Sequence, residues 1–219
     1  MTFTGEIGIA GNVDMKVIRP KVKRASLAWR LRNALRWPFL KGWLIVFVAV
    51  PVIKALRLPV MVAYGELSIR VRNGATGEWT DYGTVSRQVI TDAAVAFIVD
   101  DWDGGANDIS LFNYHGIGTG TNVESVTDTA LQTESTTALN PNNTRATGVK
   151  SQPASNQMRS VGTLTCDADI AVTEHGWFTQ AATGGGTLFD RSVFAVINLV
   201  GANPDSIQCT YTATLNAGG

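Results

Sequence analysis

The sequence has little charge, few cysteines and no long uninterrupted apolar run. Charged residues make up 16% of the chain, against about a quarter in an ordinary globular domain. A chain so poor in charge either covers much of its surface with partners or consists mostly of sheet and turn. Its two cysteines, Cys166 and Cys209, exclude a disulfide scaffold, and we expect small core residues of a protein made in a reducing cytosol.

The longest charge-free apolar stretch covers residues 42–53, which are 12 residues including Pro51. A helix that spans a membrane needs roughly 20 apolar residues, so we expect no span here. The stretch also begins too late in the sequence for a secretory signal, and no small-residue cleavage site follows it.

The charges that are present separate along the sequence, although the net charge is zero. Residues 16–72 hold 13 Lys and Arg against one acid, Glu66, a net charge of +12. Residues 73–219 hold 5 basic and 15 acidic residues, a net charge of −10. Such asymmetry indicates different partners for the two parts, or attraction between them within one subunit or between neighbours.

The amino-terminal part predicts a basic, apolar arm over residues 1–63. A short amphipathic helix is expected over 25–37, with Ser26 as N-cap and Pro38 after its end. One apolar stripe is expected from Ala28, Leu31, Leu35, Trp29 and Trp37, with Arg30, Arg32 and Arg36 mostly elsewhere. For residues 43–53, length and β-branching favour a strand buried on both faces, with a short helix as the alternative.

The remainder, residues 64–219, predicts one mainly β domain, an antiparallel β-sandwich or jelly roll. Residues 66–72 alternate apolar and polar side chains with the period of a half-buried strand, and glycine-bearing turns follow. Residues 79–86 and 88–92 are expected to form another hairpin-like unit, and 93–99 admit a short helix. Later strands are expected at 109–116, 145–152, 157–166, 170–178, 192–199 and 205–215.

Two groups of residues suggest metal ligands. His115 and His175 each precede a glycine, and Glu174 is a third candidate ligand, but we expect each imidazole to hydrogen-bond a loop carbonyl instead. Residues 100–108 resemble half of a calcium loop, with Asp101, Asp103 and Asp108 as candidate ligands. Because no Glu closes the loop, a solvated acidic turn is the preferred interpretation.

No arrangement of residues predicts catalysis. The sequence has no Gly-x-Ser-x-Gly elbow, and its glycine-rich stretches lack the lysine and following helix of a phosphate-binding loop. We therefore predict no catalytic residue, no enzyme activity and no cofactor.

The basic arm is the candidate binding segment. It fits an acidic protein surface best, while nucleic-acid phosphates and a membrane surface with tryptophan anchors are the alternatives. The residues assigned to it are Lys21, Lys23, Arg24, Trp29, Arg30, Arg32, Arg36 and Trp37.

Several short motifs then suggest a family. They are residues 81–90, 112–120, 127–131 with Glu134, 145–148, 173–176, 185–188, 190–195 and 205–208. In texture and motif they resemble tailed-phage virion proteins of the capsid-decorating or tail-associated kind, over roughly residues 64–219.

The resemblance implies a non-enzymatic virion protein that is assembled in the host cytoplasm. We expect a capsid decoration or cement protein that stabilises the head through its amino-terminal arm. Its partners would be the major capsid protein or tail and neck proteins, and further copies of itself in a homo-oligomer. A tail, neck or fibre-anchoring component is the first alternative. A glycan- or membrane-binding module that uses Trp177 and Phe178, or the arm, is the second.

Overall fold

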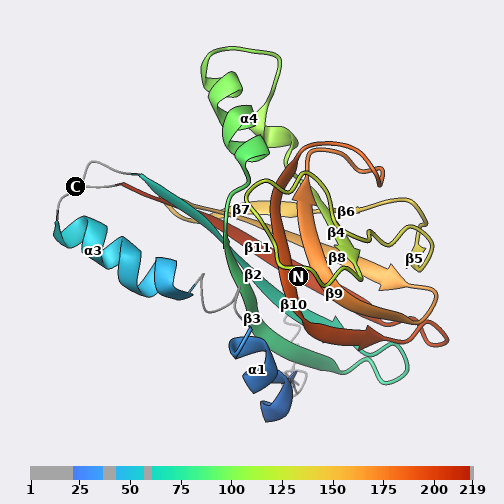
Figure 1. Cartoon of the computed structure of the whole chain (residues 1–219). Helices are drawn as coiled ribbons and strands as arrows, with labels where there is room; N and C mark the ends of the chain where they lie inside the picture. The colour runs from blue at the N-terminus through green and yellow to red at the C-terminus, as the bar shows by residue number, and fades with distance from the viewer. Residues whose placement is uncertain (1–21, 37–42, 57–60, 218–219) are drawn as a thin grey trace, which may run out of the picture.

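The computed structural model describes residues 22–36, 43–56 and 61–217 as two largely antiparallel sheets packed face to face (Figure 1). The sandwich-like, mainly β architecture confirms the predicted fold class. Its strands are β1 (Val22–Arg24), β2 (Val62–Arg72), β3 (Trp79–Val89), β4 (Tyr114–Gly118), β5 (Leu139–Asn140), β6 (Ala146–Thr147), β7 (Val149–Ala154), β8 (Gln157–Cys166), β9 (Ile170–Phe178), β10 (Leu188–Leu199) and β11 (Ser206–Asn216).

The larger sheet has the order β1-β3-β2-β11-β8-β5, with β7 also paired to β8. Its central strands alternate as the sequence predicts. Leu67 and Ile69 of β2 point into the core beside their partners Tyr211 and Cys209 of β11. The polar residues between them form the outer face of the sheet. Cys209 and Cys166 are both buried free thiols, which confirms their predicted place in the core.

The smaller sheet has the order β10-β9-β4-β6, and β9 and β10 are buried along almost their whole length. One face packs against the larger sheet. On the other face the buried carboxylate of Glu174 binds backbone amides from the loop between β4 and β5. That loop therefore covers this face, which explains why polar residues in these strands are buried.

Helix α1 (Leu27–Ala34) begins at Ser26, whose hydroxyl accepts a hydrogen bond from the backbone N–H of Trp29 at 3.2 Å. This confirms the predicted helix and its N-cap. The predicted single apolar stripe is wrong. Trp29 packs against the sandwich, whereas Leu31 and Leu35 are exposed on the side away from it. Because the side of α1 that carries Trp29 packs against the sandwich, Leu31 and Leu35 on the other side of the helix face solvent.

The segment after α1 is helical, with a π-helical part η1 (Ile45–Ala49) followed by α3 (Val50–Ala55). The strand expected over residues 43–53 is therefore wrong. A strand needs hydrogen-bonding neighbours in a sheet, and residues 43–53 pair with no strand of either sheet. A helix satisfies its backbone hydrogen bonds within the segment instead.

Helix α4 (Asp92–Trp102) starts at the N-cap Thr91 and projects from one end of the sandwich (Figure 1). This confirms a helix where the sequence admits one over residues 93–99. Ala94 and Phe97 anchor it to an aromatic cluster that includes Phe112, Trp177 and Phe189.

Three of the strand predictions differ from the observed strands. The segments 79–86 and 88–92, expected as a hairpin-like unit, form the single strand β3, which pairs with β2. Within 109–116, residues Ile109–Leu111 form a short 3-10 helix, η2, because the Asp108 carboxylate accepts the N–H of Ser110 at 2.8 Å. The strand predicted at 145–152 divides at Gly148 into β6 of one sheet and β7 of the other. A Cβ at Gly148 would lie 2.0 Å from Ser160 Oγ, so the chain needs a glycine where it passes from one sheet to the other.

Candidate interaction surface

Helix α1 is fixed across the gap between the two sheets by Asn33, which is buried. The side-chain amide donates to the carbonyl of Val85 in β3 at 2.7 Å and accepts from the N–H of Ala195 in β10 at 2.9 Å. Trp29 adds a hydrogen bond from Nε1 to the Val196 carbonyl at 2.9 Å. Residues 22–36 are thus attached to the edge of the sandwich.

The predicted binding residues of the arm have different environments. Lys23 pairs with Glu78 at 2.5 Å and Arg24 with Asp81 at 3.2 Å, so both cations meet acids of the carboxy-terminal part. Arg30 and Arg32 are exposed, and Arg36 is half-buried. Lys21 and Trp37 lie outside the described residues. Trp29 packs edge-on against Tyr82 and is not a surface anchor.

The helical segment over residues 43–56 presents an apolar surface. Most of its large apolar side chains are exposed, namely Trp43, Leu44, Phe47, Val48, Val52 and Leu56. One contact with the sandwich is the guanidinium of Arg87, 5.5 Å from the ring centroid of Phe47. Within the residues that the structure describes, no helix has the length and apolar character needed to cross a bilayer.

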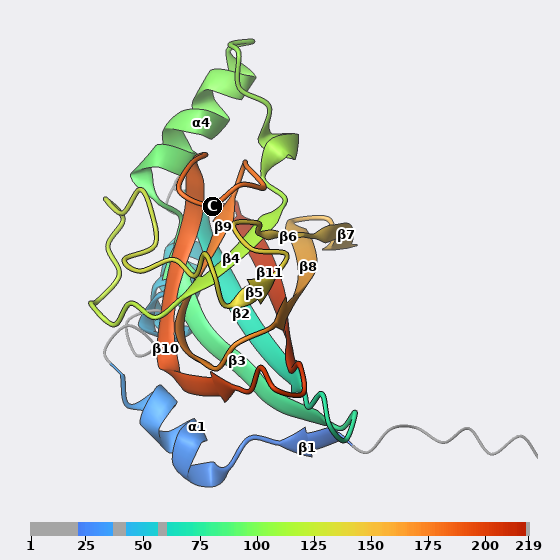
Figure 2. The same cartoon turned by 90° about the vertical axis from the view of Figure 1, so that its right-hand side faces the viewer.

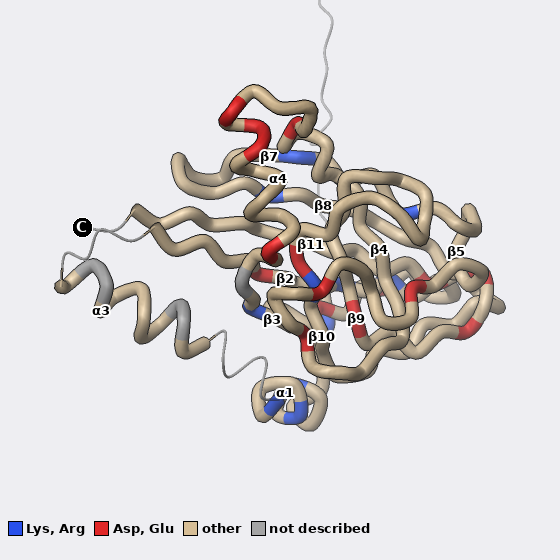
Figure 3. Tube along the Cα trace, turned by 45° about the horizontal axis from the view of Figure 1, so that its top comes forward, with Lys and Arg blue, Asp and Glu red and all other residues tan. Residues whose placement is uncertain are grey.

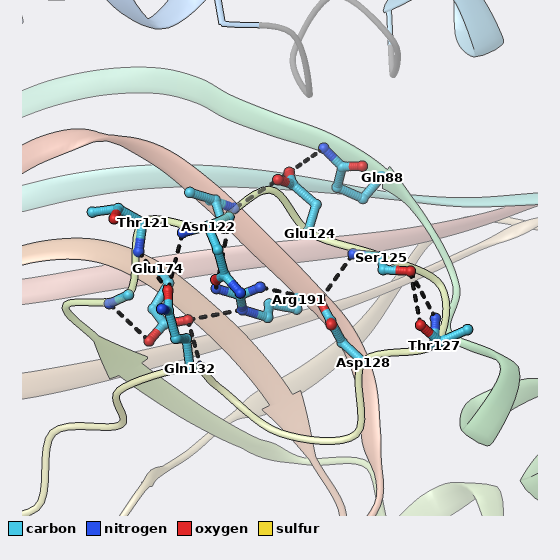
Figure 4. A network of polar contacts seen from close by, with 12 residues as sticks. Gln88, Thr121, Asn122, Glu124, Ser125, Thr127, Asp128, Gln132, Glu174 and Arg191 are labelled. Atoms are coloured by element: carbon cyan, nitrogen blue, oxygen red, sulfur yellow. Dashed lines mark hydrogen bonds and ion pairs between the residues drawn. The ribbon is translucent and has the colours of Figure 1, made fainter.

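A buried ion-pair network holds the loop of residues 119–134 against β9 and β10 (Figure 4). Glu174 is fully buried and accepts the N–H groups of Gly120, Gln132 and Thr133 at 2.7–3.0 Å. Arg191 donates to Glu174 at 2.8 Å and to Asp128 at 3.1 Å. The carboxylate therefore has several charge-assisted partners, which makes the loop a fixed part of the surface.

A second buried arginine fixes the next part of the same connection. Arg145 forms a two-point ion pair with Glu134 at 2.6 and 3.0 Å and donates to the carbonyls of Gln180 and Gly185. Its guanidinium lies 3.4 Å from the ring centroid of Phe178. These charged residues therefore stabilise loops.

The two histidines meet inside the sandwich. His115 Nδ1 lies 3.0 Å from His175 Nε2, and His115 Nε2 lies 2.9 Å from Ser160 Oγ. The expected hydrogen bonds to loop carbonyls are therefore wrong, because the rings point between the sheets. All three side chains are fully buried. Burial lowers the pKa of His115 to about 3 and that of His175 well below its usual value, so both imidazoles are neutral near pH 7.

Glu174 does not join the histidines as a ligand, since it points to the opposite face of β9 from its neighbour His175. Asp101 and Asp103 lie at the end of α4, and Asp108 caps η2. Asp100 accepts the N–H of Asn107 at 3.1 Å, as an acid does in a turn. Across the described ranges, no group of three His, Cys, Asp or Glu could hold a metal ion.

Two other carboxyls, of the buried Asp190 and the half-buried Glu124, lie beside the network. Burial raises the pKa of Asp190 to about 7 and that of Glu124 to about 7. Asp190 accepts from Ser192 at 2.7 Å and Glu124 from Gln88 at 2.5 Å. Both groups thus change protonation close to neutral pH.

No family model, curated protein or solved structure matches this chain.

The aromatics considered for glycan binding are inside the molecule. Trp177 and Phe178 are both buried, so neither ring can stack on a sugar. Trp177 instead lines an apolar cavity of about 380 Å³ beneath α4 and η2, together with Trp102, Ile109 and Met158. A groove of about 430 Å³ lies between α1 and β3.

Sequence reasoning missed the exposed side of two helices. Leu27, Leu31 and Leu35 recur at every fourth position of α1, and Val95 and Val99 do so in α4. This four-residue spacing predicts an apolar face on each helix, but it does not show whether the rest of the chain covers that face.

Proposed function

We propose that this chain is a non-enzymatic structural subunit of a tailed-phage particle, and that it decorates and stabilises the head. The observation that carries the proposal is the apolar helical surface of residues 43–56, exposed beside a sandwich whose loops are fixed by buried ion pairs. Uncovered apolar surface of this kind marks a binding site for another protein.

Rigidity supports the same proposal. Arg145 and Arg191, two of the few charged residues, are buried and serve to fix loops rather than to face solvent. A subunit that arrives with its surface already ordered loses less entropy when it binds, and many such contacts add up in a repeating lattice. The motif resemblance to virion proteins points to the same class.

The test is recovery of the chain with purified particles. Particles from cells that produce the chain are banded on a density gradient, and its copies are counted by quantitative mass spectrometry. A cement protein should be present on the order of hundreds of copies, because it follows the shell lattice, whereas a closed tail or neck ring should hold roughly a dozen. Absence of the chain from the particles would overturn the proposal.

A matched pair of variants tests the surface itself. Replacing Trp43, Phe47 and Val52 with serine should reduce incorporation at least about tenfold, since an apolar anchor is worth more than 1.4 kcal/mol. Val149→Ser removes an apolar side chain that is even more exposed, on β7, and should incorporate normally. Equal incorporation of both variants would show that residues 43–56 are not the docking surface.

A further inference from the structure

Helix α1 carries an exposed row of leucines. Leu27, Leu31 and Leu35 are 69%, 53% and 75% exposed and share one side of the helix, opposite the side on which Asn33 enters the sandwich. Leu27 and Leu31 also border the groove of about 430 Å³ between α1 and β3, whose far wall includes Tyr82 and Gly83. The row and the groove form one continuous surface.

This surface is basic at its borders. Arg30 and Arg32 flank the leucines, and Arg30 lines the groove. Among the described residues no ion pair joins either arginine to an acid. The one acid of the described groove lining, Asp81, is paired with Arg24. Figure 3 shows the Lys and Arg positions gathered on α1.

Helix α4 carries the complementary arrangement. Val95, Val99 and Trp102 are 49%, 53% and 68% exposed, while Ala94 and Phe97 hold the opposite side against the core. The acids Asp92 and Asp103 lie at the two ends of this row and are exposed. Neither acid has an ion-pair partner in the part of the chain that the structure describes. The two helical rows are each roughly 10–12 Å long at 1.5 Å per residue.

The two helices lie at opposite ends of the molecule, as both Figure 1 and Figure 2 show. They cannot meet within one chain, whereas α1 of one copy can meet α4 of the next. A contact between two different patches is heterologous, so repeating it closes a ring or extends a row of subunits.

We propose that copies of this chain associate head to tail, with α4 of one copy seated on α1 of the next and Trp102 inserted into the groove between α1 and β3. Tryptophan is the side chain most often found as the central anchor of an interface, and a groove bordered by leucines and tyrosine suits it. Opposite charges at the borders select this pairing over a pairing of like helices. The inference deepens the proposed function by naming the subunit contact, and it depends on that function only for the place of the contact in a particle.

One partner accounts for both helices, which is why we favour a second copy. Phosphates of a nucleic acid would pair with Arg30 and Arg32 but leave the leucines uncovered. An anionic bilayer would cover the α1 row but would repel the acids of α4. The helix of another copy satisfies both the apolar row and the charge of each helix.

The test is sedimentation velocity of the full chain over a concentration series at low and high salt. The paired variants are Arg30→Glu with Arg32→Glu, and Asp92→Lys with Asp103→Lys. Each pair alone should weaken association at least about tenfold, because like charges then face each other. An equimolar mixture should recover association, since each altered helix then meets its complement.

Two further substitutions keep the test independent of charge and folding. Trp102→Ala should weaken association as strongly as charge reversal, while Val149→Ser should leave it unchanged, with the circular dichroism of every variant equal to that of the wild type. A wild-type chain that stays monomeric, or a mixture that fails to recover, would overturn the head-to-tail contact. Binding of that monomer to anionic vesicles or to DNA would assign α1 to the other partner. Incorporation into particles is measured separately, so either proposal can fail alone.

Discussion

At the scale of single residues, the few charges of this chain divide into two uses. Some are buried and hold loops, as Glu174 and Arg191 do, and others remain on exposed helices, as Arg30 does. Sequence reasoning could place the acids and arginines in motifs, but not separate the two uses. The partners of Arg191 stand 17 and 63 positions away, and only the fold brings them together.

Glu174→Gln should lower the free energy of unfolding by about 3–5 kcal/mol, because it leaves the Arg191 guanidinium buried with its main counter-charge removed. Chemical denaturation at pH 7 measures the change. The matched control is Glu78→Gln, which removes an exposed ion pair with Lys23 and should cost under about 1 kcal/mol. Equal losses in the two variants would contradict this account.

Asp190 should make stability depend on pH. Burial raises its pKa from 3.8 to about 7, so the folded chain holds a proton that the unfolded chain releases between these values. Its contribution is therefore complete below pH 4 and is lost as the pH rises to 7. Relative to Asp190→Asn, the wild type should lose stability steadily across this window, and nothing more above pH 8. Parallel curves in urea denaturation from pH 4 to 9 would refute it.

At the scale of helices and strands, the sequence predicted those strands in which apolar and polar residues alternate. β8 and β9 begin and end where the apolar and polar pattern does. The prediction was wrong for residues 43–53. A continuous apolar run shows neither the two-residue period of a strand nor the 3.6-residue period of a helix, so it fits a helix as well as a strand. The prediction also failed to divide the α1 side chains between two faces, since Trp29 and Leu31 are both apolar and only the edge of the sandwich distinguishes them.

Helix α1 should depend on one side chain for its place. Asn33→Ala removes both hydrogen bonds to β3 and β10 and leaves the Val85 carbonyl and the Ala195 N–H unpaired, so we expect a loss of about 2–4 kcal/mol in thermal unfolding. The amide of Ala195 should also exchange faster with solvent. Val149→Ser, an exposed change on β7 and outside the leucine row, is the control and should leave both measurements unaltered.

At the scale of the whole molecule, the charge asymmetry of the sequence has two outcomes. Part of it is neutralised within the subunit, where Lys23 and Arg24 meet Glu78 and Asp81. The exposed cations Arg30 and Arg32 lie on α1 at one end, and the exposed acids Asp92 and Asp103 lie on α4 at the other, which gives the molecule a direction. The sequence predicted attraction between its two parts, but the positions of the opposing ends required the fold.

The buried thiols give this chain a practical property. Cys166 and Cys209 are the sole cysteines and neither is exposed, and burial raises the pKa of Cys209 to about 12. Reagents that react with thiolates therefore have no native target in the folded protein. A single cysteine engineered at any surface position can carry a fluorophore or a spin label without first deleting the natural ones, and distances between subunits in an intact assembly become directly measurable.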